Sequence, residues 1–451
     1  MTLFRARYSI IDFFRKTQTL PLYDQILSSQ WLPQREIKNI QIQNLNDLLF
    51  HCAQNVPYYI NLFKKHFFYN KKINKISEIS CLPVLNKDTI RKNFDNLKAN
   101  NFNNFKPKKG QTGGTTGEPL PVYRDKKHHS YQWANNLRSW NAGNYNLGDQ
   151  FIHIASGSLL PNTTNIITKI YNYLQNAILI TSYHLNDDKL RHIIERIKIS
   201  KASFIYGYSS SIYLLAQFCR ANNIKLDGRI KAIFTTSDML YKWQRSCIEN
   251  VFNANVFDIY GCPEGGIISF ECPNHDGYHY NQESVVVEIT NKDSNGFGKI
   301  ISTPLFNYAF PFIRYDTGDV GMLSNEKCSC GRNLIKIKKV GGRIRDFIVL
   351  QDGRYIHGAF FNHLQPLYDT SWIKNYQIIQ EKIDLLRIKF TCIDNPNQKD
   401  LTKITHAIKK GLLPSLEIVY DFNGIEYSGG GKFRLIISNV KNKWDDQYFP
   451  N

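Results

Sequence analysis

An alternation of short strands and helices between residues 200 and 265 constrains the fold of this chain more than any other feature. Three apolar runs of strand length alternate with two segments whose apolar residues recur at helical spacing. The strands are expected at residues 203–206, 231–236 and 255–260, and the helices at 210–219 and 237–251. This order predicts an α/β fold built on a parallel, doubly wound sheet.

The ends of these predicted strands carry polar residues and glycine. Ligands of doubly wound sheets bind beyond the carboxyl ends of the strands. The second strand runs into residues 235–238, Thr-Thr-Ser-Asp, and the third into residues 260–264, Tyr-Gly-Cys-Pro-Glu. The two sequences are therefore predicted to share one crevice, which residues 206–209, Tyr-Gly-Tyr-Ser, also face.

A loop rich in glycine and threonine lies upstream of this sheet. It consists of Thr112, Gly113, Gly114, Thr115, Thr116 and Gly117. Glycine lets backbone N–H groups converge on an oxyanion, and threonine adds hydroxyl donors. No lysine follows Gly117, unlike the nucleotide loop that ends in Gly-Lys-Ser/Thr. Lys432, far downstream, can supply it, which predicts an enzyme that handles a nucleotide's phosphates and brings its lysine on a separate, mobile piece.

The pattern changes to antiparallel β beyond about residue 284. Strand-like runs occur at residues 284–289, 298–302 and 312–319. After Gly341 and Gly342 the chain is typical of a small α+β domain. We therefore expect two domains, residues 1–342 and 343–451. The first should hold doubly wound sheets and a small β subdomain, and the second should be mobile.

Composition indicates a globular protein and argues against a membrane-spanning or secreted one. The chain of 451 residues is 42% apolar and 13% aromatic, which is typical of a globular protein. No run of 18 apolar residues is present, and residues 1–16 are basic and apolar without the features of a secretory signal. That segment is either a packed first helix or a peripheral contact with an anionic membrane.

The formal net charge of +19 would attract nucleic acid, anionic lipid or anionic small molecules. The basic residues are scattered, however, and no nucleic-acid-binding motif accompanies them. The nine cysteines are odd in number and mostly isolated. They argue against a disulfide framework and for the reducing cytoplasm.

The order of motifs resembles that of the adenylate-forming superfamily of acyl-CoA synthetases. More narrowly, it is similar to the phenylacetate–CoA ligase branch, which includes ligase-like proteins of capsular polysaccharide gene clusters. The matching sequences are residues 112–119, 235–238, 260–264, 314–319, 342–346 and 431–434. Each match is weak alone, but six in this order are specific, and the resemblance covers nearly the whole chain.

The resemblance implies that a carboxylic acid reacts with ATP to give an acyl-adenylate and pyrophosphate. The acyl group would then pass most often to CoA, with an amine or amino sugar as the alternative acceptor. It also implies the residues of the nucleotide site. These are Thr112, Gly113, Gly114, Thr115, Thr116, Gly117, Thr236, Ser237, Asp238, Tyr260, Gly261, Asp319 and Arg343.

Lys432, Glu264 and Arg343 are the expected catalytic residues. In the family pattern the glutamate binds Mg²⁺, an aspartate at the position of Asp319 accepts the ribose hydroxyls, and the lysine bridges the acid and the α-phosphate. Tyr206, Gly207 and Tyr208 are expected to form the wall of the acid pocket.

The sequence departs from the family pattern at several positions. Pro263 replaces a common threonine, and no lysine follows Pro119. Arg345 stands at the expected hinge, and residues 236–238 replace a more usual Gly-Glu ending. These departures put details of phosphate and adenine binding in doubt, but the core set of Glu264, Asp319, Arg343 and Lys432 remains.

A structural zinc site is also expected. Cys328 and Cys330 place two thiols on a tight turn, and Cys272 lies upstream with two histidines nearby. Three sulfurs and one nitrogen fit a closed tetrahedral site, with His279 as the first choice and His275 as the competing ligand. The alternative is a set of buried cysteines without a ligand.

Other functions remain open at this stage. One is a non-catalytic descendant that binds a nucleotide, and another is a basic protein that binds nucleic acid or membrane. Lys432 argues against the first, because a binding protein does not need it. We expect no specific nucleic acid, at most peripheral membrane contact, and a monomer or homodimer. The identity of the acid does not follow from the sequence.

Overall fold

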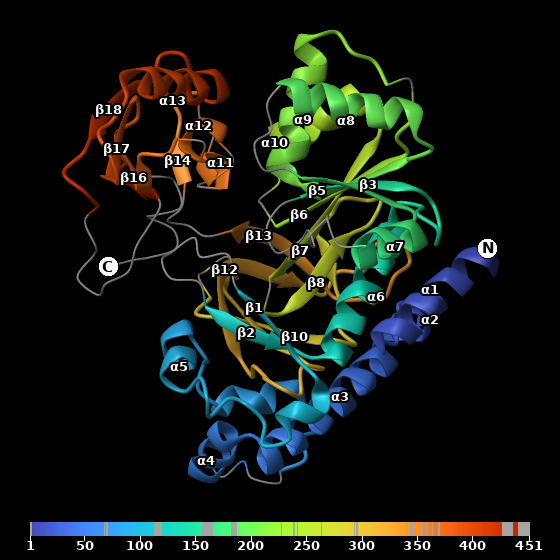
Figure 1. Cartoon of the computed structure of the whole chain (residues 1–451). Coiled ribbons are helices and arrows are strands. Elements are labelled where there is room, and N and C mark those ends of the chain that lie inside the picture. The colour runs from blue at the N-terminus through green and yellow to red at the C-terminus, as the bar shows by residue number, and fades with distance from the viewer. Residues whose placement is uncertain are drawn as a thin grey trace.

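The fold combines one large mixed sheet, a helical N-terminal region and a smaller C-terminal α/β region (Figure 1). The computed structural model describes most of the chain. The described residues are 2–66, 68, 71–111, 120–155, 166–181, 187–226, 228–237, 240, 242–262, 264–292, 294, 296–342, 347–352, 355–357, 359–362, 364–368, 370–425 and 436–440.

The large sheet has eleven strands in the order β10-β11-β12-β13-β9-β8-β7-β6-β5-β3-β4. In chain order they are β3 (Phe151–Ala155), β4 (Ala177–Thr181), β5 (Phe204–Tyr208), β6 (Ala232–Thr236), β7 (Asn255–Cys262), β8 (Gly266–Glu271), β9 (Tyr278–Tyr280), β10 (Val285–Thr290), β11 (Gly298–Pro304), β12 (Tyr315–Ser324) and β13 (Lys336–Gly342). Strands β4, β3, β5, β6 and β7 are parallel, and every further pair is antiparallel.

The parallel half confirms the predicted α/β class. Its helices are α6 (Lys126–Ala142), α7 (Ile166–Gln175), α8 (Asp187–Ile199), α9 (Ser209–Ala221) and α10 (Lys242–Phe252). Strands β5, β6 and β7 and helix α9 lie where they were predicted, whereas α10 begins five residues after the expected start at residue 237. Buried isoleucine and leucine side chains of α8 and α9 pack on one face of these strands, and aromatic residues on α6 pack on the other. Both faces are therefore covered, as parallel sheets require.

The antiparallel strands do not form a separate β subdomain. Strand β8 follows β7 through a tight turn, and β9 to β13 continue the same sheet. At this turn a side chain on Gly261 would come within 2.4 Å of the carbonyl oxygen of Gly266. The close approach of the two backbones therefore requires glycine, and it holds Cys262, Glu264 and Gly265 at the edge of the parallel strands.

The N-terminal region is helical. Its elements are α1 (Thr2–Arg15), α2 (Thr19–Ser29), α3 (Gln34–Asn55), α4 (Pro57–Lys65), η1 (Ile76–Cys81), α5 (Lys87–Lys92) and η2 (Phe102–Phe105). They are followed by the antiparallel hairpin β1 (Lys108–Gln111) and β2 (Pro121–Arg124). This hairpin encloses residues 112–120, so the glycine- and threonine-rich loop connects two paired strands.

A buried ion pair connects the N-terminal helices to the sheet. Arg138 of α6 donates to Glu283 over 2.8 and 3.0 Å and to the carbonyl oxygen of Ile26 in α2 over 3.0 Å. It also donates to Asn281 over 2.5 Å, and its side chain is fully buried. The charge is thus compensated by several acceptors, as a buried guanidinium requires.

The C-terminal region has its own sheet and core. Its elements are β14 (Phe347–Val349), β15 (Tyr355–His357), α11 (Ala359–Asn362), α12 (Gln365–Tyr368), β16 (Ile373–Lys382), β17 (Leu385–Cys392), α13 (Gln398–Gly411), β18 (Glu417–Asp421) and β19 (Ile436–Ser438). Strands β18-β17-β16-β19 form one sheet, on which Leu401, Ile404 and Ile408 of α13 pack.

Candidate active site

Part of the predicted site lies outside the described residues. This part comprises Thr112, Gly113, Gly114, Thr115, Thr116, Gly117, Asp238, Arg343 and Lys432. The remaining predicted residues are described, and most of them gather at the carboxyl ends of β5, β6 and β7.

The pairing of the parallel strands sets three of these strand ends beside one another. Gly207 lies opposite Thr235, Tyr208 opposite Thr236, and Thr236 opposite Ile259, which precedes Tyr260. Ser237 follows β6 with a φ of +70°, so the chain turns sharply as it leaves the sheet. The sequences predicted to share a crevice thus end at one edge of the sheet.

Tyr260 and Asp319 are joined directly. The Tyr260 hydroxyl donates to Oδ2 of Asp319 over 2.9 Å. Burial, followed by the charge of Asp319, raises the pKa of Tyr260 well above its usual value, so the phenol stays protonated as a donor. Asp319 is half-buried on β12, and its own backbone N–H donates to Thr317. A predicted adenine-side residue and the predicted ribose ligand are therefore neighbours.

Glu264 lies in the turn between β7 and β8 and is buried. Its Oε1 accepts a hydrogen bond of 2.8 Å from the Tyr315 hydroxyl. Burial lowers the pKa of Arg124, at the end of β2, and the charge of Glu264 works in the opposite direction. Arg124 was not among the predicted site residues, although it ends β2, the second strand of the hairpin that encloses residues 112–120.

His128 and His129 were not among the predicted site residues. His128 on α6 is buried, and its ring lies 3.5 Å from the ideal Cβ position at Gly266. Burial lowers the pKa of His128 to about 3, and burial with the charge of Arg15 lowers that of His129 to about 4. The His128 ring is therefore neutral, and its Nε2 atom is a buried polar group facing the Glu264 turn.

The expected wall of the acid pocket is tightly packed. The Tyr206 ring lies 4.7 Å from that of His153 and 5.0 Å from that of Trp140. A side chain on Gly207 would come within 2.2 Å of the carbonyl oxygen of Ile154 on the neighbouring strand. Burial lowers the pKa of His153 to about 3, so this wall is neutral.

Cys262 is a packing residue. Burial, followed by the charge of Glu264, raises the pKa of its thiol well above the usual value. Its sulfur accepts a hydrogen bond of 3.1 Å from the Gly265 backbone. A protonated thiol is a poor nucleophile, so no covalent step is assigned to it.

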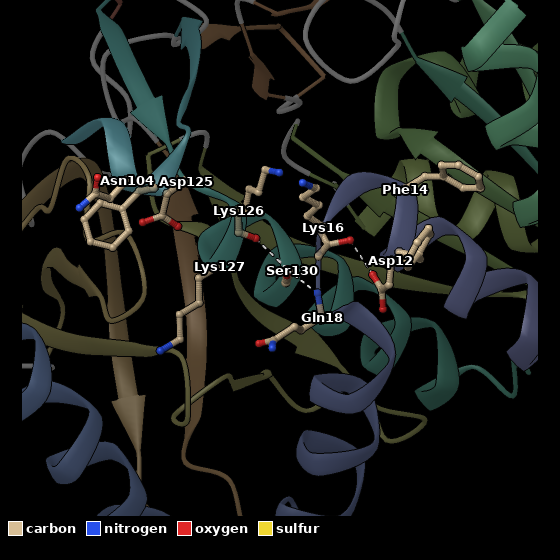
Figure 2. Close-up of a pocket in the computed structure, with 12 residues that line it drawn as sticks. Asp12, Phe14, Lys16, Gln18, Asn104, Asp125, Lys126, Lys127 and Ser130 are labelled. Atoms are coloured by element: carbon tan, nitrogen blue, oxygen red, sulfur yellow. Dashed lines mark hydrogen bonds between the residues drawn. The ribbon is translucent and has the colours of Figure 1, made fainter. Parts of the chain in front are cut away.

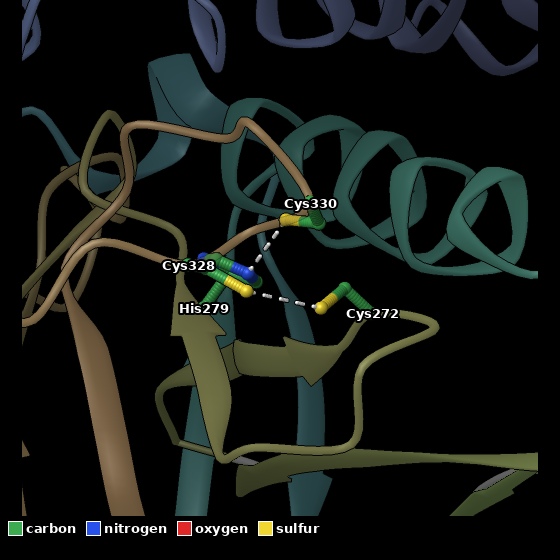
Figure 3. A group of neighbouring side chains, drawn as sticks. All are labelled: Cys272, His279, Cys328 and Cys330. Atoms are coloured by element: carbon green, nitrogen blue, oxygen red, sulfur yellow. Dashed lines mark hydrogen bonds between the residues drawn. The ribbon is translucent and has the colours of Figure 1, made fainter.

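The four predicted metal ligands lie together (Figure 3). All of the ligand atoms of Cys272, His279, Cys328 and Cys330 are within 4.8 Å of one another. The sulfurs of Cys272 and Cys328 are 3.6 Å apart, and Cys330 Sγ is 3.3 Å from His279 Nε2. Tetrahedral zinc, with Zn–S bonds of about 2.3 Å and Zn–N bonds of about 2.0 Å, would place such atoms about 3.5–3.8 Å apart. The donor set and its spacing therefore fit zinc.

The two histidines near this cluster differ in their contacts. His279 is fully buried on β9, and its Nδ1 lies 3.3 Å from the carbonyl oxygen of Leu334, so Nε2 is directed at the sulfurs. His275 Nδ1 instead lies 3.3 Å from Glu271 and 3.2 Å from Arg245. The described cluster thus contains His279 and not His275.

A cavity of about 730 Å³ lies apart from these residues (Figure 2). It opens between the end of α1, η2 and the start of α6. Its lining includes Phe13, Phe14, Lys16, Phe105 and Lys126, and none of the predicted site residues. Because the described residues of the predicted motifs lie at the strand ends and not in this cavity, we assign the chemistry to the strand ends.

Comparison with known proteins finds similar sequences. Residues 348–439 match the model of the CapK C-terminal domain. Protein CapK of Staphylococcus aureus is 26% identical over 436 residues, which cover 95% of this chain and 95% of CapK. Phenylacetate-coenzyme A ligase of Thermus thermophilus is 30% identical over 103 residues, or 21% of this chain and 23% of that protein.

Solved structures share the fold. A crystal structure of 2-hydroxyisobutyryl-CoA ligase in complex with 2-HIB-AMP and CoA has a TM-score of 0.64 and 17% identity, and covers 91% of each chain. Another, with R3-HIB-AMP in the postadenylation state, has a TM-score of 0.62 and 16% identity, and covers 91% of this chain and 92% of the other. Together these matches show that the chain has the fold of adenylate-forming enzymes, and that its sequence is similar to those of CapK and phenylacetate-coenzyme A ligase.

Proposed function

We propose that this protein is an AMP-forming ligase that activates a carboxylic acid with ATP and transfers the acyl group, most often to CoA. The observation that carries the proposal is the hydrogen bond between Tyr260 and Asp319, close to the buried Glu264 turn. Two sequence motifs that adenylate-forming enzymes use for one nucleotide, residues 260–264 and 314–319, are thereby in contact.

The reaction joins two anions, and the proposed residues counter their repulsion. A carboxylate oxygen attacks the α-phosphorus of ATP, the bond to the bridging oxygen breaks, and pyrophosphate leaves. Lys432 is proposed to lie between the acid and the α-phosphate, where a fixed cation stabilises the developing charge. Arg124 adds a second cation next to Glu264. Residues 112–117 are proposed to hold the departing phosphates through backbone N–H groups and hydroxyls.

The nucleoside is proposed to bind at the strand ends. Asp319 would accept the ribose hydroxyls, while Tyr260 orients the carboxylate and, with Thr236 and Ser237, borders the adenine. Glu264 would hold Mg²⁺, which shields phosphate charge when bound. Tyr315 fixes one oxygen of Glu264, so the carboxylate is oriented in advance.

CoA is the favoured acceptor, and an amine or amino sugar is the alternative. A solved structure of the shared fold holds 2-HIB-AMP and CoA, which supports a thiol acceptor. The similarity to CapK supports the alternative only weakly. Incubation of the acyl-adenylate with CoA or with an amino sugar separates the two, because a thioester or an amide is the product.

We also propose two functional domains, residues 1–342 and 343–451, with a hinge near Arg345. The support is that the C-terminal region has a sheet of its own and a separate hydrophobic core around Trp372 and Phe390. Such a unit can rotate as a rigid body, so that Lys432 leaves the adenylate and the acceptor enters.

Zinc is proposed to be structural, bound by Cys272, His279, Cys328 and Cys330. Four protein ligands leave no open coordination position, so zinc would hold the β8–β9 segment to the loop before β13 and take no part in the reaction. All nine cysteines lie in the described part of the chain and none is in a disulfide, which supports the proposed cytoplasmic location.

The test is ATP–pyrophosphate exchange across a panel of aryl, fatty, hydroxy and amino acids. Exchange should depend on one class of acid, and Lys432→Ala should lower its rate about 10²–10³-fold. Lys410→Ala, an exposed lysine of α13 in the same region, is the control and should keep the wild-type rate. No exchange with any acid, while AMP still binds, would instead identify a non-catalytic nucleotide-binding descendant.

A further inference from the structure

Exposed apolar side chains gather on two helices that play no part in the proposed reaction. Thirteen large apolar residues are exposed in the described part of the chain, and seven of them lie on α1 and α7. They are Ile10, Phe13 and Phe14 on α1 and Ile166, Ile167, Ile170 and Tyr173 on α7. Phe13 and Phe14 are each 77% exposed. We call these seven residues the α1/α7 patch.

The two helices present the patch on the same side of the molecule. Tyr8, Ile11 and Arg15 of α1 and Tyr171 and Gln175 of α7 border a narrow space next to His129 and Trp133 of α6. Arg7 lies over the Tyr173 ring at 5.2 Å, and Arg15 over the Tyr171 ring at 3.4 Å. Both helices thus turn these inner residues towards the middle of α6, and the seven exposed apolar side chains lie on their remaining, solvent-exposed faces. Figure 1 shows α1 along one edge of the molecule, with α7 beside it.

The charges around the patch are almost all positive. Helix α1 carries Arg5, Arg7 and Arg15, and α7 carries Lys169. The single acidic residue of the two helices, Asp12, is buried and accepts hydrogen bonds of 2.6 Å from Thr17 and 2.8 Å from the Leu20 backbone. Arg5 forms an ion pair with Asp24 of α2, and Arg15 lies on the inner face, so Arg7 and Lys169 supply the cations that accompany the apolar side chains of the patch.

The cavity of about 730 Å³ extends this cationic border. Phe13 and Phe14 form part of its lining, next to Lys16 and Lys126, whose side chains extend in the same direction (Figure 2). Burial, followed by the charges of Lys106, Lys16 and Lys108, lowers the pKa of Lys126. Several ammonium groups are therefore close enough to repel one another, and an anionic headgroup beside Phe14 would relieve that repulsion.

We propose that the α1/α7 patch docks the protein on the surface of an anionic lipid bilayer. The isoleucine and phenylalanine side chains would enter the boundary between headgroups and acyl chains, and Lys16, Lys126 and Lys169 would contact lipid phosphates. Among the described helices, none is long and apolar enough to cross a bilayer, so the contact is peripheral. A protein partner is the competing occupant, but α1 and α7 themselves carry no exposed carboxylate, and their cations and apolar side chains are complementary to anionic lipid.

The proposal is tested by cosedimentation of the full chain with vesicles of phosphatidylcholine, alone or with added phosphatidylglycerol. The wild type should bind the anionic vesicles and release as salt increases. Phe13→Ser/Phe14→Ser should weaken binding about tenfold or more, because two rings lose their transfer into the bilayer. Lys16→Gln/Lys169→Gln should weaken it by about fivefold per charge. Ile199→Ser, at a residue 74% exposed outside the patch, should have no effect.

A second measurement keeps the proposal falsifiable if binding is weak. The emission of a Phe14→Trp variant should shift to the blue on addition of anionic vesicles, and that of Ile199→Trp should not. Failure of the wild type to bind, or equal binding by the patch and control variants, would overturn the proposal. A change of molecular mass in solution on Phe13→Ser/Phe14→Ser, without any effect on vesicles, would also overturn it and assign the patch to a second copy of the chain. None of these outcomes depends on the ATP–pyrophosphate exchange reaction.

Discussion

Asp319 and Tyr260 are 59 residues apart in the chain and are joined by one hydrogen bond of 2.9 Å. Asp319→Asn removes the charge that we propose accepts the ribose hydroxyls. We expect the Kd for AMP, measured by calorimetry, to rise about 10- to 100-fold, because hydrogen bonds to a charged group contribute about 1.5–3 kcal/mol. Asp316→Asn is the matched control, since Asp316 on the same strand pairs with the exposed Lys299. Equal losses in the two variants would contradict the assignment.

His153 makes the stability of the protein depend on pH. Its folded-state pKa, about 3, is below the usual value of 6.5 because of burial, so the unfolded chain binds the extra proton first as the pH falls. The part of the folding free energy that depends on a neutral His153 ring is fully present above pH 6.5 and is lost progressively towards pH 3. As the pH falls from about 6 to 4, the free energy of unfolding measured in urea should decrease by about 1.4 kcal/mol per pH unit more for the wild type than for His153→Gln. Parallel curves for the two proteins would show that His153 is not buried as a neutral ring.

At the scale of elements, the proposed zinc site holds the loop before β13 against β8 and β9 (Figure 3). Elemental analysis should find about one zinc per chain, and Cys330→Ser should lose it and unfold at a lower temperature. Cys330→Ser removes one of the four proposed ligands. Cys81→Ser is the control, because it alters an exposed thiol of η1 outside the cluster and should keep the zinc. If the wild type, purified without chelators, contains no zinc, the site is a set of packed thiols instead.

The ion pair of Arg138 and Glu283 joins helices α2 and α6 to the β9–β10 segment. Arg138→Met leaves a buried carboxylate without its partner, and we expect the free energy of unfolding to fall by about 3–5 kcal/mol. Arg138→Met/Glu283→Gln should recover part of that loss, because the remaining buried group is neutral. A loss below about 1 kcal/mol in the single variant would indicate that water replaces the guanidinium.

The elements that the sequence predicted are those with a clear local pattern. Strands β5, β6 and β7 are short apolar runs between periodic helices, so their class and order followed from spacing. The single continuous sheet did not follow, because the antiparallel pairing of β7 with β8 depends on the close approach at Gly261 and Gly266. Such pairing joins backbones across a turn and leaves no periodicity to detect.

The sequence predicted some residues of the candidate site and missed others. Tyr260, Glu264 and Asp319 belong to motifs with recognisable spacing, and the structure places Tyr260 against Asp319. Arg124 has no motif of its own, since a single arginine after a strand is common on surfaces. Only the packing of the β1–β2 hairpin near Glu264 gives Arg124 its place beside the site. Its place at the end of the strand that follows residues 112–117 was the one available signal.

At the scale of the whole molecule, the chain has an N-terminal body around the large sheet and a C-terminal region with its own core. The strand ends that carry Tyr260, Glu264 and Asp319 belong to the body, whereas Lys432 belongs to the C-terminal region. Both regions must therefore act on one substrate in the proposed reaction. The α1/α7 patch lies on the body, so lipid docking would leave the C-terminal region able to move.

The most direct test of acid activation follows the oxygen atoms. Once exchange has identified an acid, that acid is supplied with ¹⁸O in its carboxylate, together with ATP and the acceptor, and the AMP is analysed by mass spectrometry. If a carboxylate oxygen attacks the α-phosphorus, the released AMP contains one ¹⁸O atom and the pyrophosphate contains none. Release of unlabelled AMP, or of ADP and phosphate, would contradict the formation of an acyl-adenylate.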